Sequence, residues 1–295
     1  MITMREFILT CNSTVDMPKE WLQDNKITML PLKYTLEGKT YTDKDDSALT
    51  PKQFFDELRA GHMSVTSQIN AEEAKEFFEP ILKEGKDILH LSFSSGLSGT
   101  YNSTRLAAVE LRELYPEAKI TVVDTLCACM GEGLLLHNAI KLRDNGMSLD
   151  DLVNWCEENK LRVNHFVTVD DLNHLHRGGR VSKLAAVAGT MLQMKPILAV
   201  DNNGKLGVIG KERGRKKSIA KIVDLALEAS KGVDNDLVLI THGDCLEDAQ
   251  YLASLVEEKL GISNILINTI GTVIGSHTGP GVLSVFVMGK ERPSF

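Results

Sequence analysis

Short apolar runs of β type alternate along this chain with segments whose apolar residues recur at helical spacing. The runs predicted to be strands are residues 6–10, 87–93, 119–125, 163–169, 236–242 and 264–270. Strands that alternate with helices in this way predict α/β layers with a largely parallel sheet. The segment "ITMLPLKYTL" (27–36) is also predicted to be extended, with Pro31 at an edge position.

The segment "PILAVDNNGKLGVIGK" (196–211) breaks the alternation, because Asn203-Gly204 stands between two β-like runs. This dipeptide is a strong signal for an antiparallel hairpin. We therefore expect two α/β domains, residues 1–160 with the parallel sheet and residues 161–295 with a mixed sheet that contains the hairpin. No low-complexity linker divides them.

Composition excludes several classes of protein. A net charge of −7 disfavours a general binder of nucleic acid or anionic membranes. Five cysteines without regular spacing indicate reduced thiols rather than a disulfide framework. The N-terminus lacks the pattern of a signal peptide, and no run of 18 apolar residues occurs. We expect a soluble, cytoplasmic protein.

Four segments rich in Ser, Thr and Gly are candidates for a binding site, because ligands of open α/β sheets collect in loops beyond the carboxyl ends of the strands. They are "CNST" (11–14), "VTSQ" (65–68), "SSGLSGTYN" (94–102) and "IGSHTGPG" (274–281). Hydroxyls and backbone N–H groups at helix N-termini form an uncharged cradle for an anionic head group. The alternative is that these residues only cap helices and form turns.

Catalytic and metal motifs are lacking. "GLSGT" has Thr100 where a nucleophile elbow needs glycine, and neither a Walker loop nor a dinucleotide fingerprint occurs. Cys127-x-Cys129 and His174-x-His176 have no partner pair at ligand spacing. We therefore expect no catalytic residue, no metal and no cofactor.

"HRGGRVSK" (176–183) places two glycines between Arg177 and Arg180. Glycines let backbone and guanidinium groups approach one point closely. The alternative is an exposed junction between two helices.

"TSQ", "SSGLSGTYNS", "VVDT" followed by "MGEG", "HRGGRVSK", "KPIL" and "GSHTGPGVLSVFVMG" occur in this order over nearly the whole chain. Together they resemble the DegV family of bacterial fatty-acid-binding proteins. The resemblance implies a two-domain α/β protein that encloses one long-chain fatty acid between its domains. It also implies a carrier rather than an enzyme, which delivers the acid to a separate ATP-dependent kinase subunit that makes acyl phosphate.

The resemblance further implies that Thr66 and Ser98 hydrogen-bond the fatty-acid carboxylate, and that Ser95, Arg180 and His277 lie near it. A carboxylate offers about four lone-pair sites, which short hydroxyls can satisfy without bulk. A cation from Arg180 or His277 would compensate the buried charge, or the acid would bind protonated.

Two positions depart from the family pattern. Asn12 stands where an aspartate is expected before Ser-Thr, and Ile69 stands where a proline often follows "TSQ". Position 12 therefore carries no acid, and residue 69 alters at most the rigidity of its segment.

The segment "KERGRKK" (211–217) is basic at five of its seven positions. We expect it to follow the second strand of the hairpin and to lead into a helix that starts near Ser218. The predicted docking surface consists of Lys205, Arg213, Arg215 and Lys216, with Arg180 as a further candidate. It would bind an acidic face of the kinase subunit or steer toward the phosphates of bound ATP. The alternative is a solvated helix entrance.

Two other functions remain open. The chain could be a stand-alone phosphotransferase or hydrolase that acts on a small polar substrate in the hydroxyl-rich cleft. A lipid-sensing regulator that binds DNA is disfavoured by the net charge of −7 and by the lack of a helix-turn-helix signal.

Overall fold

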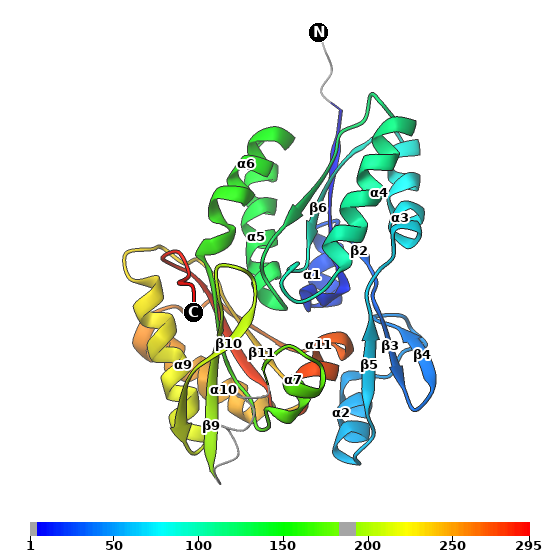
Figure 1. The fold of residues 1–295 in the computed structure, drawn as a ribbon. Coiled ribbons are helices and arrows are strands. Elements are labelled where there is room, and N and C mark those ends of the chain that lie inside the picture. The colour runs from blue at the N-terminus through cyan, green and yellow to red at the C-terminus, as the bar shows by residue number, and fades with distance from the viewer. Residues whose placement is uncertain (1–4, 183–192) are drawn as a thin grey trace.

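The computed structural model describes residues 5–182 and 193–295, which form three sheets flanked by helices (Figure 1). Lys183, the last residue of "HRGGRVSK", lies outside the described residues. The predicted α/β class is confirmed, with one purely parallel sheet and one mixed sheet. No helix in the described ranges is long and apolar enough to cross a membrane.

The first sheet has four parallel strands in the order β2-β1-β6-β7. Its strands are β1 (Phe7–Asn12), β2 (Thr28–Leu30), β6 (Asp87–Ser92) and β7 (Ile120–Asp124). Its helices are α1 (Lys19–Asp24), α3 (Ala71–Lys83), α4 (Thr100–Leu114), α5 (Met130–Asp144) and α6 (Leu149–Asn159). Every residue of β6 is buried, which explains its unbroken apolar pattern. Helices α3 and α4 pack on one face of this sheet and share a separate core with it.

The second sheet has six strands in the order β10-β9-β8-β13-β11-β12, and among these only β11 and β12 pair in parallel. Its strands are β8 (Val163–Thr168), β9 (Met194–Val200), β10 (Leu206–Arg213), β11 (Val238–His242), β12 (Ile265–Thr269) and β13 (Leu283–Met288). Helices α9 (Arg215–Ser230) and α10 (Leu246–Leu260) pack against one face. Helix α5 packs against β8, β11 and β13 as well as β6, so it lies between the two sheets.

The predicted hairpin is confirmed as β9 and β10, joined by residues 201–205. Asp201 closes the turn, because its carboxylate accepts hydrogen bonds from the backbone N–H groups of Asn203 and Lys205 at 2.9 and 2.8 Å. Gly204 adopts a φ of +70°, a conformation that favours glycine. The predicted domain boundary near residue 160 falls between the end of α6 and the start of β8.

A third, antiparallel sheet of order β4-β3-β5 was not predicted. Its strands are β3 (Lys33–Leu36), β4 (Lys39–Thr42) and β5 (Ser64–Ser67). The predicted extended segment 27–36 splits at Pro31, since β2 joins the first sheet and β3 joins the third. Helix α2 (Pro51–Arg59) packs beside this small sheet and starts at the capping box of Thr50 and Gln53.

Three predicted boundaries were wrong. "VTSQ" is not a loop after a strand, because Thr66 lies within β5. Most of "IGSHTGPG" is not a loop either, since α11 spans Thr272–Thr278. Strand β10 continues to Arg213 and α9 begins at Arg215, so the basic segment belongs to a strand and a helix. The remaining described helices are η1 (Ser13–Val15), η2 (Lys160–Arg162) and α7 (Asn173–Arg177).

Candidate functional site

An apolar cavity of about 300 Å³ lies where the three sheets meet. Its volume is at the lower end of the range of small-molecule sites. The apolar side chains that line it are Leu32, Phe93, Leu97, Val167, Leu175, Val200, Leu206, Ile270, Val273, Ile274, Val282 and Phe286. Those that lie in strands belong to the second sheet, Val273 and Ile274 lie on α11, and Leu32 and Phe93 follow β2 and β6 of the first sheet. The cavity is therefore built from both halves of the chain.

The structure brings four of the five predicted head-group residues to this cavity: Thr66, Ser98, Arg180 and His277. Ser95 is the exception. It is exposed, its backbone N–H donates to the Asp124 carboxylate at 3.1 Å, and it is not part of the lining. The turn at residues 94–97 directs Ser98 inward and leaves Ser95 on the outside.

Thr66 reaches the cavity because side chains alternate along β5. Ser64 and Thr66 are half-buried on one face, whereas Val65 and Ser67 are exposed on the other. The inner face lies against α11, where the Ser64 and Ser276 hydroxyls lie 2.7 Å apart. Thr66 Oγ1 lies 2.8 Å from His277 Nε2. These two contacts attach the edge strand of the third sheet to α11.

His277 is held in a neutral state. Burial, and secondarily the charge of Arg180, lowers the pKa of its imidazole to about 4. Its Nδ1 is buried, has no hydrogen-bond partner among the residues that the structure describes, and lies against Gly178, where a Cβ would come within 2.2 Å of Nδ1. Gly178 therefore leaves room for the ring. With the ring proton on Nε2 and donated to Thr66, the Thr66 hydroxyl hydrogen is free for another acceptor.

Arg180 supplies the positive charge of the site. Its Nε and Nη2 donate to the Leu97 carbonyl at 3.1 and 2.9 Å, and its Nη1 donates to the Gly178 carbonyl. No carboxylate among the described residues pairs with it. Burial lowers the pKa of Arg180, but a guanidinium stays protonated at neutral pH. The cavity wall thus contains a guanidinium held by two backbone carbonyls, and no carboxylate in the described ranges neutralises it.

The glycines of "SSGLSGT" let the Ser98 segment fit between two neighbours. A Cβ at Gly96 would lie 2.6 Å from the Asn203 carbonyl of the hairpin turn, and one at Gly99 would lie 2.0 Å from the Gln68 amide oxygen. The Ser98 hydroxyl accepts from the Thr100 backbone N–H at 3.2 Å at the start of α4. Its orientation is therefore fixed beside the cavity.

Two lining residues, His165 and Cys129, were missed by the sequence analysis. His165 Nδ1 donates to the Val163 carbonyl at 3.1 Å, and Nε2 accepts from the Ala128 N–H at 3.2 Å. Burial is the main cause that lowers the pKa of His165, so it is neutral. The signal for His165 in the sequence is a histidine inside a strand predicted to be buried.

No metal site is found within the described ranges, where no group of three metal-ligating side chains converges. The Cys127 and Cys129 thiols have separate partners, the Lys160 carbonyl and the Asp16 carboxylate. Burial raises the pKa of Cys127 to about 12, so this thiol is not a ready ligand or nucleophile.

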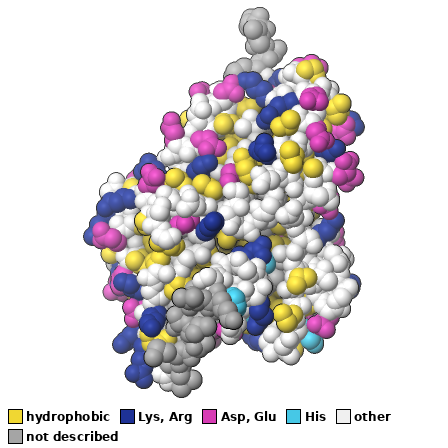
Figure 2. All heavy atoms as spheres, viewed as in Figure 1, with side chains coloured by type: hydrophobic (Ala, Val, Ile, Leu, Met, Phe, Trp, Pro, Cys, Tyr) yellow, Lys and Arg dark blue, Asp and Glu magenta, His cyan; other side chains and the backbone are white. Residues whose placement is uncertain are grey.

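The predicted docking residues are only partly together. Arg213 and Lys216 are exposed near the start of α9, where Figure 2 shows basic side chains at the lower left. Arg215 is ion-paired with Asp248 at 2.7 Å. Lys205 lies at the other end of β10, roughly 25 Å away at about 3.3 Å per strand residue. Lys205 therefore lies outside the local patch of Arg213, and Arg180 lies at the wall of the cavity.

Comparison with known proteins identifies the family of the chain. The family model described as "Uncharacterised protein, DegV family" matches residues 7–290. The chain belongs to the DegV family. A DegV domain-containing protein of Clostridium perfringens is 44% identical over 289 residues, which are 98% of this chain and 99% of that protein.

Solved structures of other DegV proteins are also similar. DegV from Bacillus subtilis, described as a fatty acid binding protein, is 30% identical, covers 97% of this chain and 100% of its own, and has a TM-score of 0.82. A DegV family protein of Thermus thermophilus, described by its fatty acid binding, is 29% identical with the same coverage and a TM-score of 0.86.

Proposed function

We propose that this DegV protein binds one long-chain fatty acid, with the carboxylate at Thr66, Ser98 and Arg180 and the tail in the apolar cavity. The observation that carries the proposal is the pairing of this cavity with the Arg180 guanidinium at its wall, which no carboxylate of the described residues neutralises. The relatives that bind fatty acids support it.

The head-group contacts suit a carboxylate. The hydroxyls of Thr66 and Ser98 donate hydrogen bonds, and Arg180 supplies the opposite charge without rearrangement. Neutral His277 orients Thr66 through the 2.8 Å contact and adds no second charge. Without Arg180 the buried carboxylate would cost several kcal/mol, so we propose that the acid binds in its ionised form.

The tail supplies most of the affinity. Each CH₂ group moved from water into an apolar cavity contributes about 0.8 kcal/mol, so a long chain outweighs a few polar contacts. The head group then fixes the register of the chain in the cavity. This division of roles fits a carrier that must hold a poorly soluble ligand and present one end of it.

We further propose that the protein presents the carboxylate to a separate ATP-dependent kinase subunit that forms acyl phosphate. The exposed side chains of Arg213 and Lys216 are the proposed docking surface, with Lys205 as a second contact at the other end of β10. Arg213 and Lys216 form a compact basic patch on a chain of net charge −7, and Lys205 stands apart from it. Its charge complements an acidic partner.

Native mass spectrometry of protein purified under mild conditions tests fatty-acid binding. We expect an added mass in a ratio near one to one, identified as a long-chain acid after denaturing extraction. Absence of any bound acid, together with no uptake of added palmitate or oleate, would contradict the carrier. The alternative of a stand-alone enzyme predicts turnover of ATP or an ester by the purified protein alone.

A further inference from the structure

Asp16 is a fully buried carboxylate at the junction of the two larger sheets, and the fatty-acid site does not include it. It follows η1 and adopts a left-handed conformation with a φ of 53°. Its Oδ1 accepts a hydrogen bond from the Gly271 N–H at 2.9 Å, and its own carbonyl accepts from Asn268 Nδ2 at 2.7 Å. Asp16 of the N-terminal half thus contacts Asn268 and Gly271, which lie at the two ends of the short segment that leads into α11.

The same carboxylate has two further partners. Lys44 Nζ lies 3.4 Å from Oδ1, and the Cys129 thiol donates to Oδ2 at 3.1 Å. Cys129 itself lines the cavity. Next to this cluster, the Thr272 hydroxyl donates to the Asp43 carboxylate at 2.7 Å, so the first turn of α11 has a second attachment. The titratable groups that face Asp16 or act on it electrostatically are therefore Lys44, Asp43, Cys129 and Glu132.

The contact with Gly271 is tight. A Cβ at Gly271 would lie 2.3 Å from Asp16 Oδ1, although the backbone there has an ordinary φ of −71°. Glycine is needed at this position for close approach and not for its conformation. The carboxylate and the start of α11 therefore fit together without free space.

Helix α11 links the fixed position of Gly271 to the ligand site, because it begins at the next residue and lines the cavity. Within its seven residues, Val273, Ile274, His277 and Thr278 line the cavity. A shift at Gly271 would move the whole short helix, and with it the Thr66–His277 contact of 2.8 Å.

We propose that Asp16 is a positioning residue for the fatty-acid site: by holding Gly271 and Asn268 it sets the place of α11, and so of His277, without touching the ligand. The expected effect on oleate dissociation rests on the proposed function. The position of His277 in the ligand-free protein does not depend on that function. Loss of the Asp16 carboxylate should loosen the hold on the head group although every head-group residue is still present.

The test is a double-mutant cycle on the dissociation rate of bound oleate. We expect Asp16→Ala to raise the rate about tenfold. Asp16→Asn keeps the size and one acceptor oxygen for Gly271, so it should stay within about threefold of the wild type. In a His277→Gln background, Asp16→Ala should raise the oleate dissociation rate by less than a further threefold. The imidazole that Asp16 positions is already absent from that background. Full additivity in that background would overturn the proposal.

Asp87→Ala is the matched control. Asp87 is also buried, accepts from a backbone N–H (Lys119, 2.9 Å) and pairs with a cation (Arg5, 3.0 Å), but it lies at the amino end of β6, away from the cavity. It should destabilise the protein without changing the oleate dissociation rate. An equal acceleration by Asp87→Ala would show that general loss of stability explains the effect.

Nuclear magnetic resonance of the ligand-free protein separates this inference from the proposed function. Asp16→Ala should shift the imidazole signals of His277, whereas Asp87→Ala should not. If Asp16→Ala does not fold, Gly271→Ala is the alternative variant, because its Cβ would collide with the Asp16 carboxylate. It should also shift the imidazole signals of His277. Unchanged His277 signals overturn the positioning role, whereas a wild type that never binds oleate overturns only the proposed function.

Discussion

Thr66 of β5 and His277 of α11 lie 2.8 Å apart, although 211 positions separate them in the sequence. The contact joins the small antiparallel sheet to the C-terminal half of the chain at the wall of the apolar cavity. His277 is half-buried and neutral, so it orients the Thr66 hydroxyl through this contact without adding a second positive charge. This pair is therefore the centre of the proposed head-group site.

Removing a head-group hydroxyl should weaken fatty-acid binding. We expect Thr66→Val and Ser98→Ala each to cost about 1.5–3 kcal/mol of binding free energy, as for a hydrogen bond to a charged group. Fatty-acid exchange measures the loss. Thr40→Val, which removes an exposed hydroxyl on β4, is the control and should bind normally. Wild-type affinity in the Thr66→Val/Ser98→Ala double variant would show that other hydroxyls hold the carboxylate.

Gly178→Ala should disturb the head-group site from the Nδ1 side of the His277 ring, opposite the contact with Thr66. Its Cβ would come within 2.2 Å of His277 Nδ1, so the ring or the segment after α7 must move. We expect a loss of about 1–3 kcal/mol in the free energy of unfolding, typical of overpacking, together with weaker fatty-acid binding. Gly210→Ala, whose Cβ would meet nothing closer than 3.9 Å, is the control. Equal effects of the two substitutions would rule out the contact as the cause.

Stability of the ligand-free protein should depend on His277 at acidic pH. The pKa of His277 is lowered from 6.5 to about 4, so between these values the unfolded state binds a proton that the folded state does not. Its contribution to stability is therefore present above pH 6.5 and is lost as the pH falls toward 4. The maximum loss is on the order of 3 kcal/mol, for a shift of about 2.5 pKa units at 1.36 kcal/mol per unit.

Denaturant unfolding of delipidated protein between pH 4 and 8 measures this contribution. Other buried histidines, such as His90 with a pKa lowered to about 3, have the same sign and remain in every variant. The difference between the wild type and His277→Gln isolates His277 and should shrink as the pH falls. A difference that stays constant over this range would mean that His277 has an ordinary pKa.

The parallel sheet and the hairpin could be predicted because their signals are local: apolar runs of strand length and the Asn203-Gly204 turn. Helix α11 could not. Its sequence "TVIGSHT" has the composition of a loop, and tertiary packing decides its conformation, since Gly275 lies against the rings of Phe54 and Phe55. The partner rings are more than 200 positions away, so no local pattern contains them.

The residues of the candidate site could also be predicted only in part, because local patterns do not contain long-range contacts. Motifs placed Thr66, Ser98, Arg180 and His277 in one group, and the structure brings all four to the cavity. Ser95 was included by the same reasoning although its side chain lies outside. Which serine of a Ser-rich turn faces inward depends on the backbone path, and here that path is fixed by contact of Gly96 with the hairpin turn.

Affinity should follow the length of the acyl chain. Shortening the ligand by two carbons should cost about 1.6 kcal/mol, or roughly fifteen-fold in Kd, while the cavity still surrounds the tail. Competition among saturated acids of graded length measures the slope. A flat response would contradict an enclosed tail, whereas a slope that disappears above a certain length would give the depth of the cavity.

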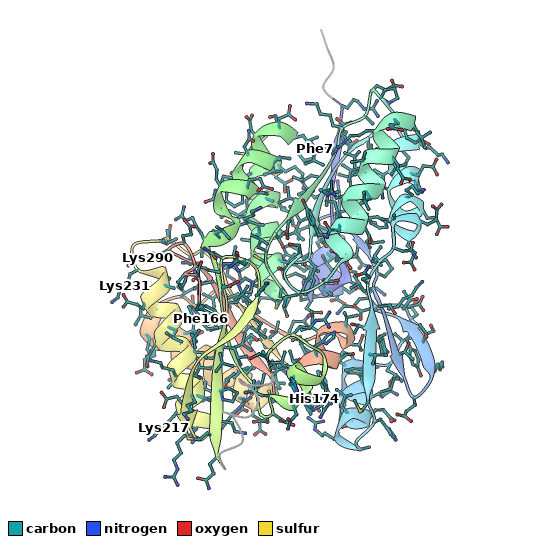
Figure 3. The ribbon with its side chains drawn as sticks, viewed as in Figure 1. Phe7, Phe166, His174, Lys217, Lys231 and Lys290 are labelled. Atoms are coloured by element: carbon teal, nitrogen blue, oxygen red, sulfur yellow. The ribbon has the colours of Figure 1, made fainter. Side chains whose placement is uncertain are left out.

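The last prediction concerns the kinase subunit. Arg213 and Lys216 are exposed, and the neighbouring Lys217 points away from the protein in Figure 3. Arg215 is engaged with Asp248, so replacing it would test folding rather than docking. Arg213→Glu/Lys216→Glu should slow acyl-phosphate formation in a coupled assay, with weaker association, altered salt dependence and unchanged fatty-acid occupancy.

Lys231→Glu/Lys290→Glu is the matched control for that double charge reversal. Both lysines are exposed on the same half of the protein, and Lys231 lies past the opposite end of α9 from Lys216, about 22 Å away at 1.5 Å per helical residue (Figure 3). The control changes the net charge equally, so a general electrostatic effect would slow both variants alike. A defect confined to Arg213→Glu/Lys216→Glu assigns docking to the start of α9. Normal kinase support by that variant at both low and physiological salt would mean that the patch is only a solvated surface.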